Sequence, residues 1–401
     1  MTFAAIEAGF AASLSTRSAE DVARIGALAP VLALTPTEHA ALAGALTRLE
    51  GSAKPGKSPR ARQTPSIEVY DPNELTRAIS LHTKPASEDG LDEILRASYV
   101  SQGATAIADA LQRIARHKDG ARRTLAAPGW NHLLDVVVAL HGLAHLDKVR
   151  DVIANAVRLS IRSQSGLLLP PLLFNGPPGV GKSWVAGAIA KALGFSPMKF
   201  AMGVSNSLSS ITGLSPSWKD ANVGRLATEI LFGQSAAPFF ILDEIDKLGA
   251  THYQNDPHGA LLTLLESETA RDFKDELLEI PFRVDRVMWA LTSNDRSLLP
   301  GHLLDRLLVV DVPEPDADTR RRIALSLFAD ANASAGNAFA APDEDVLDAV
   351  AAVGLRQARR IFALAMGVAA AAERTTVEAG DIASARRLAG ADLRLAPKMG
   401  F

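Results

Sequence analysis

One stretch of the chain combines residue types and spacing that suit phosphate chemistry. It follows the apolar residues 171–174, has the form G-x-x-x-x-G-K-S, and precedes residues 184–193, which have helical periodicity. Glycines let the backbone curl so that successive N–H groups point at one anion, and a helix start adds unpaired donors. We therefore predict a phosphate-binding loop made of Gly176, Pro177, Pro178, Gly179, Val180, Gly181, Lys182, Ser183 and Trp184. In this loop Lys182 would reach the outer phosphates and the Ser183 hydroxyl would bind magnesium.

Polar residues at two later positions could complete a site for ATP hydrolysis. Asp243 and Glu244 follow an apolar run, and Asn294 ends another that begins at Val287. One carboxylate would help to hold the magnesium shell, and the second would polarise the attacking water. Asn294 would orient the same water, although an Asn at this place is usually a turn residue.

Two arginines could supply cations to the charge that develops in phosphoryl transfer. Arg306 stands just before an apolar run, where a salt bridge with Asp305 is the alternative interpretation. Arg356 could bring a second cation, and its neighbours Arg359 and Arg360 compete for that role.

The apolar runs predict the elements that must position these residues. Strands are expected at residues 171–174, 237–246, 287–294 and 308–312, with helical stretches between them. This alternation implies βαβ units and a mainly parallel sheet, whose ligands bind at the carboxyl ends of the strands.

The rest of the chain divides by composition. We expect a helical N-terminal region at 1–50, a basic Pro/Gly linker at 51–66, a helical accessory region at 67–130, an α/β nucleotide-binding domain at 131–312 and a helical domain at 313–401. Helix starts are expected at Ser18 and Thr35.

Composition excludes several classes of protein and site. The chain has 401 residues, 47% hydrophobic residues, a net charge of −3 and no cysteine, so disulfides and thiolate sites are absent. No apolar run reaches the ~18 residues that a membrane span needs, and the N-terminus does not resemble a signal peptide. A cytoplasmic protein without membrane partners is expected.

Taken together, these motifs resemble the AAA+ ATPases, and most closely the ATPase module of the Lon protease family. The similar text covers roughly residues 143–365 and includes GPPGVGKS, ILDEIDKL, NDPHGALLTLLE, TSN, LLDR and GLR, together with the F-x-D-x-x-L-E-I-P-F run. The resemblance implies a P-loop NTPase (AAA+) α/β fold: a parallel sheet with helices on both faces, preceded by a helical region and followed by a helical lid.

The resemblance also implies roles for single residues. Lys182 becomes the phosphate-binding lysine, Ser183 and Asp243 the magnesium ligands, and Glu244 the catalytic base. Asn294 becomes sensor 1, Arg306 an arginine finger given to a neighbouring subunit, and Arg356 sensor 2. Trp218 and Lys219 fall where the family has the pore-loop pair that grips a polypeptide.

Three departures from the family shape the expected function. The protease domain is expected to be absent, and the first 130 residues differ from the family's substrate-binding region. Two local motifs also differ: the pore pair is Trp-Lys rather than aromatic-aliphatic, and Ala144-His145 replaces the Tyr-Gly before the adenine-contacting helix. We expect a Mg-ATP-dependent protein remodeller, assembled as a homo-hexamer, that acts on a client protein with a separate peptidase or adaptor as partner. The alternatives are a nucleic-acid-dependent ATPase, which is less favoured, and an ATP-binding regulatory switch.

Overall fold

The computed structural model describes residues 2–51, 64–83, 107–141, 143–202, 208–216, 221–248, 257–352 and 355–390. The chain divides into two compact units, one made of residues 1–175 and 183–310 and the other of residues 176–182 and 311–401.

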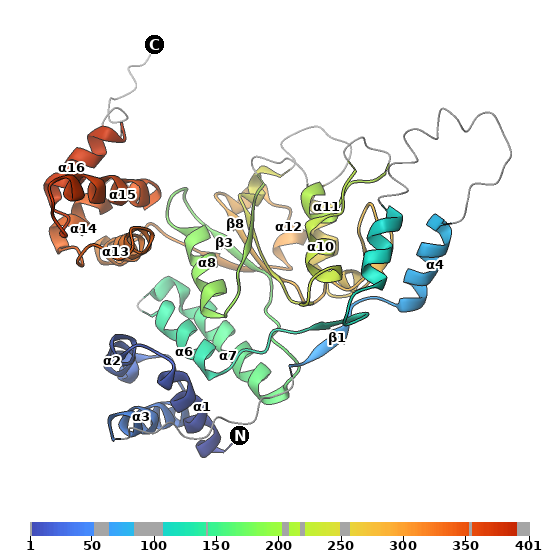
Figure 1. The fold of residues 1–401 in the computed structure, drawn as a ribbon, viewed down its shortest axis with the longest axis horizontal. Coiled ribbons are helices and arrows are strands. Elements are labelled where there is room, and N and C mark those ends of the chain that lie inside the picture. Colours follow the sequence, from blue (N-terminus) through green and yellow to red (C-terminus); the bar gives the residue numbers. More distant parts are fainter. Residues whose placement is uncertain are drawn as a thin grey trace, which may run out of the picture. The chain divides into compact units, whose positions relative to one another are not determined.

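A five-stranded sheet forms the centre of the first unit (Figure 1). Its order is β4-β5-β8-β3-β9, and the pairs β3–β8, β5–β8 and β4–β5 are parallel. The strands are β3 (Leu172–Asn175), β4 (Met198–Ala201), β5 (Phe239–Asp243), β8 (Met288–Ser293) and β9 (Leu308–Asp311). The four predicted strands are confirmed. The edge strand β4 was not predicted, because its residues alternate between half-buried and exposed and form no apolar run.

Helices cover both faces of this sheet (Figure 1). Side chains alternate across a strand, so Phe239 and Phe240 of β5 face opposite ways. Phe239 meets the ring of Phe195, which follows α8 (Lys182–Ala192), at a centroid distance of 5.7 Å. Phe240 belongs instead to the core that contains the buried residues of α10 (Arg225–Leu231). The expected α/β fold with helices on both faces is confirmed.

Shorter elements complete the first unit around the sheet. They are α6 (Trp130–Ala139), α7 (Asp147–Ser163), α9 (Ser209–Thr212), α11 (Pro257–Leu265), α12 (Gly301–Leu304), β6 (Phe273–Lys274), β7 (Pro281–Phe282), and the 3-10 turns η2 (Ala144–Leu146), η3 (Ile245–Lys247), η4 (Thr269–Arg271) and η5 (Arg296–Leu298).

Three helices lie in the N-terminal region, and the second and third begin where the sequence predicts. They are α1 (Phe3–Ser15), α2 (Ala19–Leu28) and α3 (Pro36–Gly51), with the turn η1 (Ala29–Val31) between the last two. The Ser18 hydroxyl accepts the N–H of Asp21 at 3.1 Å, and Thr35 and Glu38 form a reciprocal capping box. Phe10 of α1 packs on Trp130 of α6 at a ring distance of 5.2 Å.

Residues 64–125 contain strands as well as helices. Strand β1 (Ser66–Glu68) pairs antiparallel with β2 (Arg122–Thr124), and between them lie α4 (Pro72–Thr83) and a helix at residues 107–115. The purely helical interpretation of this stretch therefore missed the two strands, which are too short to show an alternating pattern. Ile107, Leu111 and Ile114 share one hydrophobic core with β5 and β8, so the stretch packs on the sheet.

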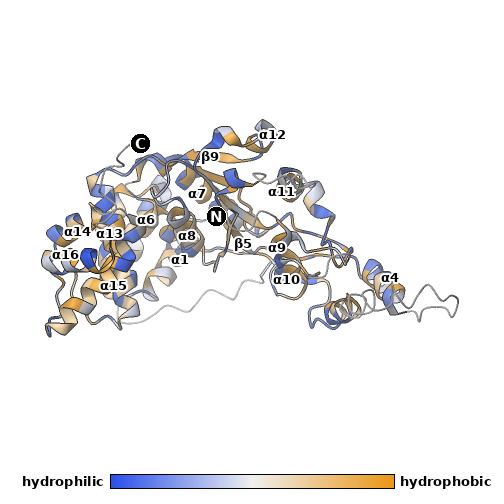
Figure 2. Ribbon diagram, turned by 90° about the horizontal axis from the view of Figure 1, so that it is seen from above, coloured by the Kyte–Doolittle hydropathy of each residue, from blue (hydrophilic) through white to orange (hydrophobic). Residues whose placement is uncertain are grey.

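The C-terminal helices form a core of their own. They are α13 (Ala317–Ser334), α14 (Glu344–Ala351), α15 (Leu355–Ala371) and α16 (Ala379–Leu388). Each carries both hydrophobic and hydrophilic residues (Figure 2), and the apolar ones, such as Phe328 and Phe362, are buried against each other. The predicted helical C-terminal region is confirmed.

None of the helices in the described ranges is both long enough and apolar enough to span a membrane.

Candidate functional site

The glycine-rich loop connects β3 to α8, as its motif requires. Gly179 and Gly181 have φ angles of +88° and +96°, which side chains rarely adopt, and a Cβ on Gly176 would lie 2.1 Å from the carbonyl oxygen of Val312. The Lys182 ammonium donates to the carbonyl oxygens of Gly176 at 2.7 Å and of Pro177 at 2.9 Å. The loop thus holds its lysine against its own curled backbone, which is the arrangement that presents a cation to phosphate oxygens.

Asp243, at the carboxyl end of β5, accepts hydrogen bonds from two hydroxyl groups. The Ser183 hydroxyl donates to Asp243 Oδ1 at 2.6 Å, and the Thr292 hydroxyl donates to the same oxygen at 3.0 Å. Hydroxyl and carboxylate oxygens are the ligands that Mg²⁺ prefers. Ser183 and Asp243 therefore present a donor set that fits this ion, with the remaining positions left to phosphate oxygens and water.

Thr292 is a residue that the sequence motifs did not single out. It is 1% exposed within β8, and its hydroxyl also accepts the backbone N–H of Glu244 at 3.0 Å. One side chain thus fixes both the carboxylate of Asp243 and the backbone of Glu244. Its signal in the sequence is the pair of hydroxyl residues, Thr292 and Ser293, at the end of an otherwise apolar strand.

Glu244 has an unusual backbone conformation. Its φ and ψ are +61° and +50°, the left-handed region, which is strained by about 1–2 kcal/mol for a side-chain-bearing residue. Strain of this kind persists where surrounding contacts hold it. Here the Thr292 hydroxyl holds the N–H, and the carboxylate Oε2 accepts from Lys247 Nζ at 2.6 Å.

Asn294 lies next to this turn. Its backbone N–H donates to Asp246 Oδ1 at 3.2 Å, which joins the end of β8 to the turn after β5. The structure therefore gathers Asp243, Glu244 and Asn294 at the carboxyl ends of two neighbouring parallel strands, where ligands of such sheets bind.

Arg306 lies between α12 and β9, half-buried. Its guanidinium donates to the carbonyl of His302 at 2.7 Å and reaches the carboxylate oxygens of Glu266 at 3.3 and 3.4 Å. The acidic partner is thus Glu266 rather than the adjacent Asp305 that the sequence suggested. The pair keeps 34% and 45% of its side chains exposed, so an incoming anion can compete with Glu266 for the guanidinium.

For the other predicted site residues, the structure describes fewer features or none. Trp184 is half-buried at the start of α8. Arg356 belongs to α15, but its side chain lies outside the described part of the structure, and so do Trp218 and Lys219 altogether. In the described residues no group of three or more His, Cys, Asp or Glu side chains gathers as a metal site, so a cation here would depend on Ser183, Asp243 and the nucleotide.

Comparison with known proteins agrees with this geometry. Residues 172–312 match the model of the family described as "ATPase family associated with various cellular activities (AAA)". The chain is 36% identical over 179 residues to a mitochondrial Lon protease homolog of Yarrowia lipolytica, which is 45% of this chain and 15% of that protein. It is 39% identical over 166 residues to the Lon protease of Elusimicrobium minutum, which is 41% of this chain and 20% of that protein.

The matched region is thus a small part of each of these relatives. A solved structure, the RuvB Holliday junction branch migration motor of Thermotoga maritima, is 15% identical, covers 60% of this chain and 68% of its own, and has a TM-score of 0.38.

Proposed function

We propose that this chain, whose residues 172–312 form an AAA ATPase module similar to that of Lon proteases, hydrolyses Mg-ATP to ADP and phosphate in order to remodel or unfold proteins. The single observation that carries the proposal is a hydrogen-bond network at the ends of β5 and β8. The Ser183 and Thr292 hydroxyls donate to Asp243, and the Thr292 hydroxyl also accepts the backbone N–H of Glu244. This network supports Ser183 and Asp243 as magnesium ligands next to the carboxylate of Glu244.

Each residue has one task in this mechanism. Lys182 binds the outer phosphates, Ser183 and Asp243 would hold Mg²⁺, and Glu244 accepts a proton from the attacking water. A Mg²⁺ ion held by Ser183 and Asp243 would supply positive charge against the charge that develops on the phosphate oxygens. Asn294 orients the water. Arg356 of the lid supplies a further cation to the same phosphates.

The active form in this proposal is a ring, a homo-hexamer, in which Arg306 of one subunit completes the site of the next. The half-exposed position of Arg306, with a weak and displaceable partner in Glu266, supports such a role. Trp218 and Lys219 would then line the centre of the ring and grip a client polypeptide.

Peptide-bond hydrolysis is not part of the proposed activity. A separate peptidase or adaptor would take over the unfolded client, and the proposed setting is the cytoplasm. These statements are tested by incubating the chain with a fluorescent client that bears an unstructured tail. We expect loss of native fluorescence with ATP and no peptide fragments; fragments without added peptidase would contradict the proposal.

The grip on the client is tested by Trp218→Ala. This variant should hydrolyse ATP at a rate close to wild type yet fail to unfold the client, because the change lies outside the nucleotide site. Unfolding at the wild-type rate would exclude Trp218 from the grip.

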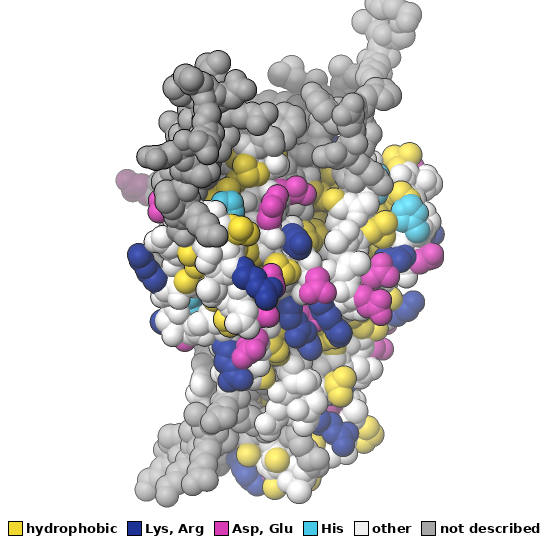
Figure 3. All heavy atoms as spheres, turned by 90° about the vertical axis from the view of Figure 1, so that its right-hand side faces the viewer, with side chains coloured by type: hydrophobic (Ala, Val, Ile, Leu, Met, Phe, Trp, Pro, Cys, Tyr) yellow, Lys and Arg dark blue, Asp and Glu magenta, His cyan; other side chains and the backbone are white. Residues whose placement is uncertain are grey.

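A nucleic-acid-dependent ATPase is the competing function. The face shown in Figure 3 has Lys and Arg side chains interspersed with Asp and Glu, rather than the single-sign surface that phosphate backbones favour. Stimulation of ATP hydrolysis by DNA or RNA that falls steeply with salt, without stimulation by unfolded protein, would favour this competitor.

A further inference from the structure

A buried carboxylate lies outside the ATPase mechanism, at the base of the loop of residues 213–224. Asp275 follows β6 and is 0% exposed. Its Oδ2 accepts the N–H of Gly224 at 2.7 Å, while its Oδ1 accepts the N–H groups of Leu277 at 3.0 Å and Leu278 at 3.2 Å. One side chain therefore ties the end of this loop to the turn between β6 and β7.

The two limbs of the loop are also joined by their backbones. The N–H of Leu214 donates to the carbonyl of Asn222 at 3.0 Å, and the N–H of Glu276 donates to the carbonyl of Thr212 at 3.0 Å. Residues 212–214 and 222 are thus joined to each other and to the turn after β6 by backbone hydrogen bonds.

Glycine is required at both ends of this base. Gly213 has a φ of +92°, and a Cβ there would lie 2.7 Å from both carboxylate oxygens of Asp275. A Cβ on Gly224 would lie 2.4 Å from the backbone nitrogen of Gly213. Both distances are shorter than real Cβ contacts, so side chains at these positions would force the limbs away from the carboxylate.

The position of Asp275 is costly unless its hydrogen bonds are made. Burial raises the pKa of this carboxyl, and the three backbone donors act against that rise. A buried charge needs such partners, and removal of the charge would leave the donors of the loop base unpaired.

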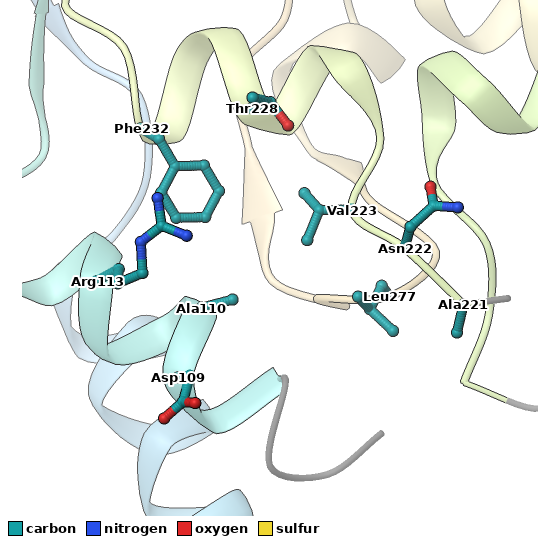
Figure 4. A pocket seen from close by; sticks show the side chains of 9 residues that line it. All are labelled: Asp109, Ala110, Arg113, Ala221, Asn222, Val223, Thr228, Phe232 and Leu277. Atoms are coloured by element: carbon teal, nitrogen blue, oxygen red, sulfur yellow. The ribbon is translucent and has the colours of Figure 1, made fainter. Parts of the chain in front are cut away.

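The returning limb packs on the core on one side, through the partly buried Ala221 and Val223. Asn222 and Val223 line an open pocket of about 310 Å³, together with Leu277 and residues of the helix at 107–115 (Figure 4). Arg113 of that helix lies over the ring of Phe232, 4.8 Å from its centroid. The bond from Gly224 to Asp275 therefore holds the end of a limb that also borders a pocket.

We propose that Asp275 is a positioning residue that clamps residues 212–214 to residues 222–224, and that this clamp couples ATP hydrolysis to the unfolding of a client protein. The second half of this statement rests on the proposed function. The clamp itself does not, and the two can be tested apart.

Hydrogen exchange tests the clamp directly. In Asp275→Asn the amides of Gly224, Leu214 and Leu277 should exchange about tenfold to a hundredfold faster than in wild type, because a hydrogen bond to a charged acceptor is lost. The amides of β5 should be unchanged, which shows that the sheet is folded. Unchanged exchange at Gly224 would overturn the clamp, whether or not the protein unfolds clients.

A matched control and a second variant sharpen this measurement. Glu276→Gln makes the same charge change at an exposed neighbour and keeps the backbone bond to Thr212, so its exchange should match wild type. Gly224→Ala disturbs the same base from the loop side and serves where Asp275→Asn does not fold. Faster exchange in Glu276→Gln than in the two clamp variants would also overturn the proposal.

Client unfolding tests the coupling. Asp275→Asn should keep the wild-type KM for ATP and a basal turnover within about twofold, while the rate of client unfolding falls about tenfold or more. Fast exchange at Gly224 combined with wild-type unfolding would overturn the coupling. If wild type itself unfolds no client, the proposed function fails, and the exchange result still decides the clamp.

Discussion

At the scale of single residues, the hydroxyl of Thr292 fixes the positions of the two acidic residues, Asp243 and Glu244. It holds Asp243 by donating and holds the backbone of Glu244 by accepting, so both residues depend on one buried atom. A carboxylate base is effective only when its position is fixed before the reaction begins.

Substitution of Thr292 tests this dependence. Thr292→Val keeps the shape but removes the hydroxyl, so turnover should fall about tenfold to a hundredfold while the affinity for MgATP changes little. Thr292→Ser, which keeps the hydroxyl, should restore most of the turnover. Steady-state phosphate release and nucleotide binding measure the two quantities, and a valine variant as fast as wild type would remove Thr292 from the site.

Part of the site could be read directly from the sequence because its chemistry is local. The loop from Gly176 to Ser183 needs glycines, a lysine and a hydroxyl at fixed spacing, and such a pattern is recognisable in the sequence alone. Thr292 and Asp275 were not recognised as functional, because their importance comes from partners about 50 residues away that only the folded sheet brings near.

At the scale of elements, strands were predictable where burial on both faces makes them continuously apolar. This holds for β3, β5 and β8 but fails for β4 and for β1 with β2, which lie at an edge or in a two-stranded ladder. Helix starts were predictable at Ser18 and Thr35 because a cap is a local motif.

An ion pair between Glu38 of α3 and Arg158 of α7 gives a prediction about the free energy of unfolding. Arg158 of α7 donates to both carboxylate oxygens of Glu38 at 2.8 Å, and Glu38 is 4% exposed. Burial would raise the pKa of Glu38, but the bonds from Arg158 and Thr35 outweigh it and lower that pKa below 4.5. A lowered folded-state pKa means stability that is present above the unfolded-state pKa and is lost as the pH falls through the folded value.

Glu38→Gln should therefore lower the free energy of unfolding by about 1–2 kcal/mol at pH 7, a loss moderated by the partial exposure of Arg158. The difference between the variant and wild type should shrink below about pH 4.5 as the wild-type carboxylate becomes protonated. Urea unfolding at several pH values measures this. A difference that is constant down to pH 3 would exclude the ionised pair as its source.

At the scale of the whole molecule, the ring predicts that two inactive variants can complement each other. Arg306→Ala should bind ATP but hydrolyse it ~10³-fold more slowly, since it lacks the cation for the neighbouring site. Mixed with Glu244→Gln, each Arg306→Ala subunit keeps its own base and can receive an intact arginine from its neighbour. In an equal, random mixture about a quarter of the sites should be active.

Phosphate release after subunits of the two variants are mixed and exchanged measures this complementation. A mixture no faster than the sum of the two separate variants would place the action of Arg306 within its own subunit. Native mass spectrometry of the same samples gives the number of subunits, for which we expect six.

The most direct test of the central claim is a comparison of MgATP turnover and MgATP binding in wild type and Glu244→Gln. In the proposed mechanism the Glu244 carboxylate, whose backbone N–H is held by Thr292, is the general base, a role that contributes about 10²- to 10⁴-fold. We expect Glu244→Gln to bind MgATP with an affinity close to wild type and to release phosphate at least about 10²-fold more slowly. A glutamine variant that turns over within twofold of wild type, or a wild-type protein that neither binds nor hydrolyses MgATP, would contradict the account.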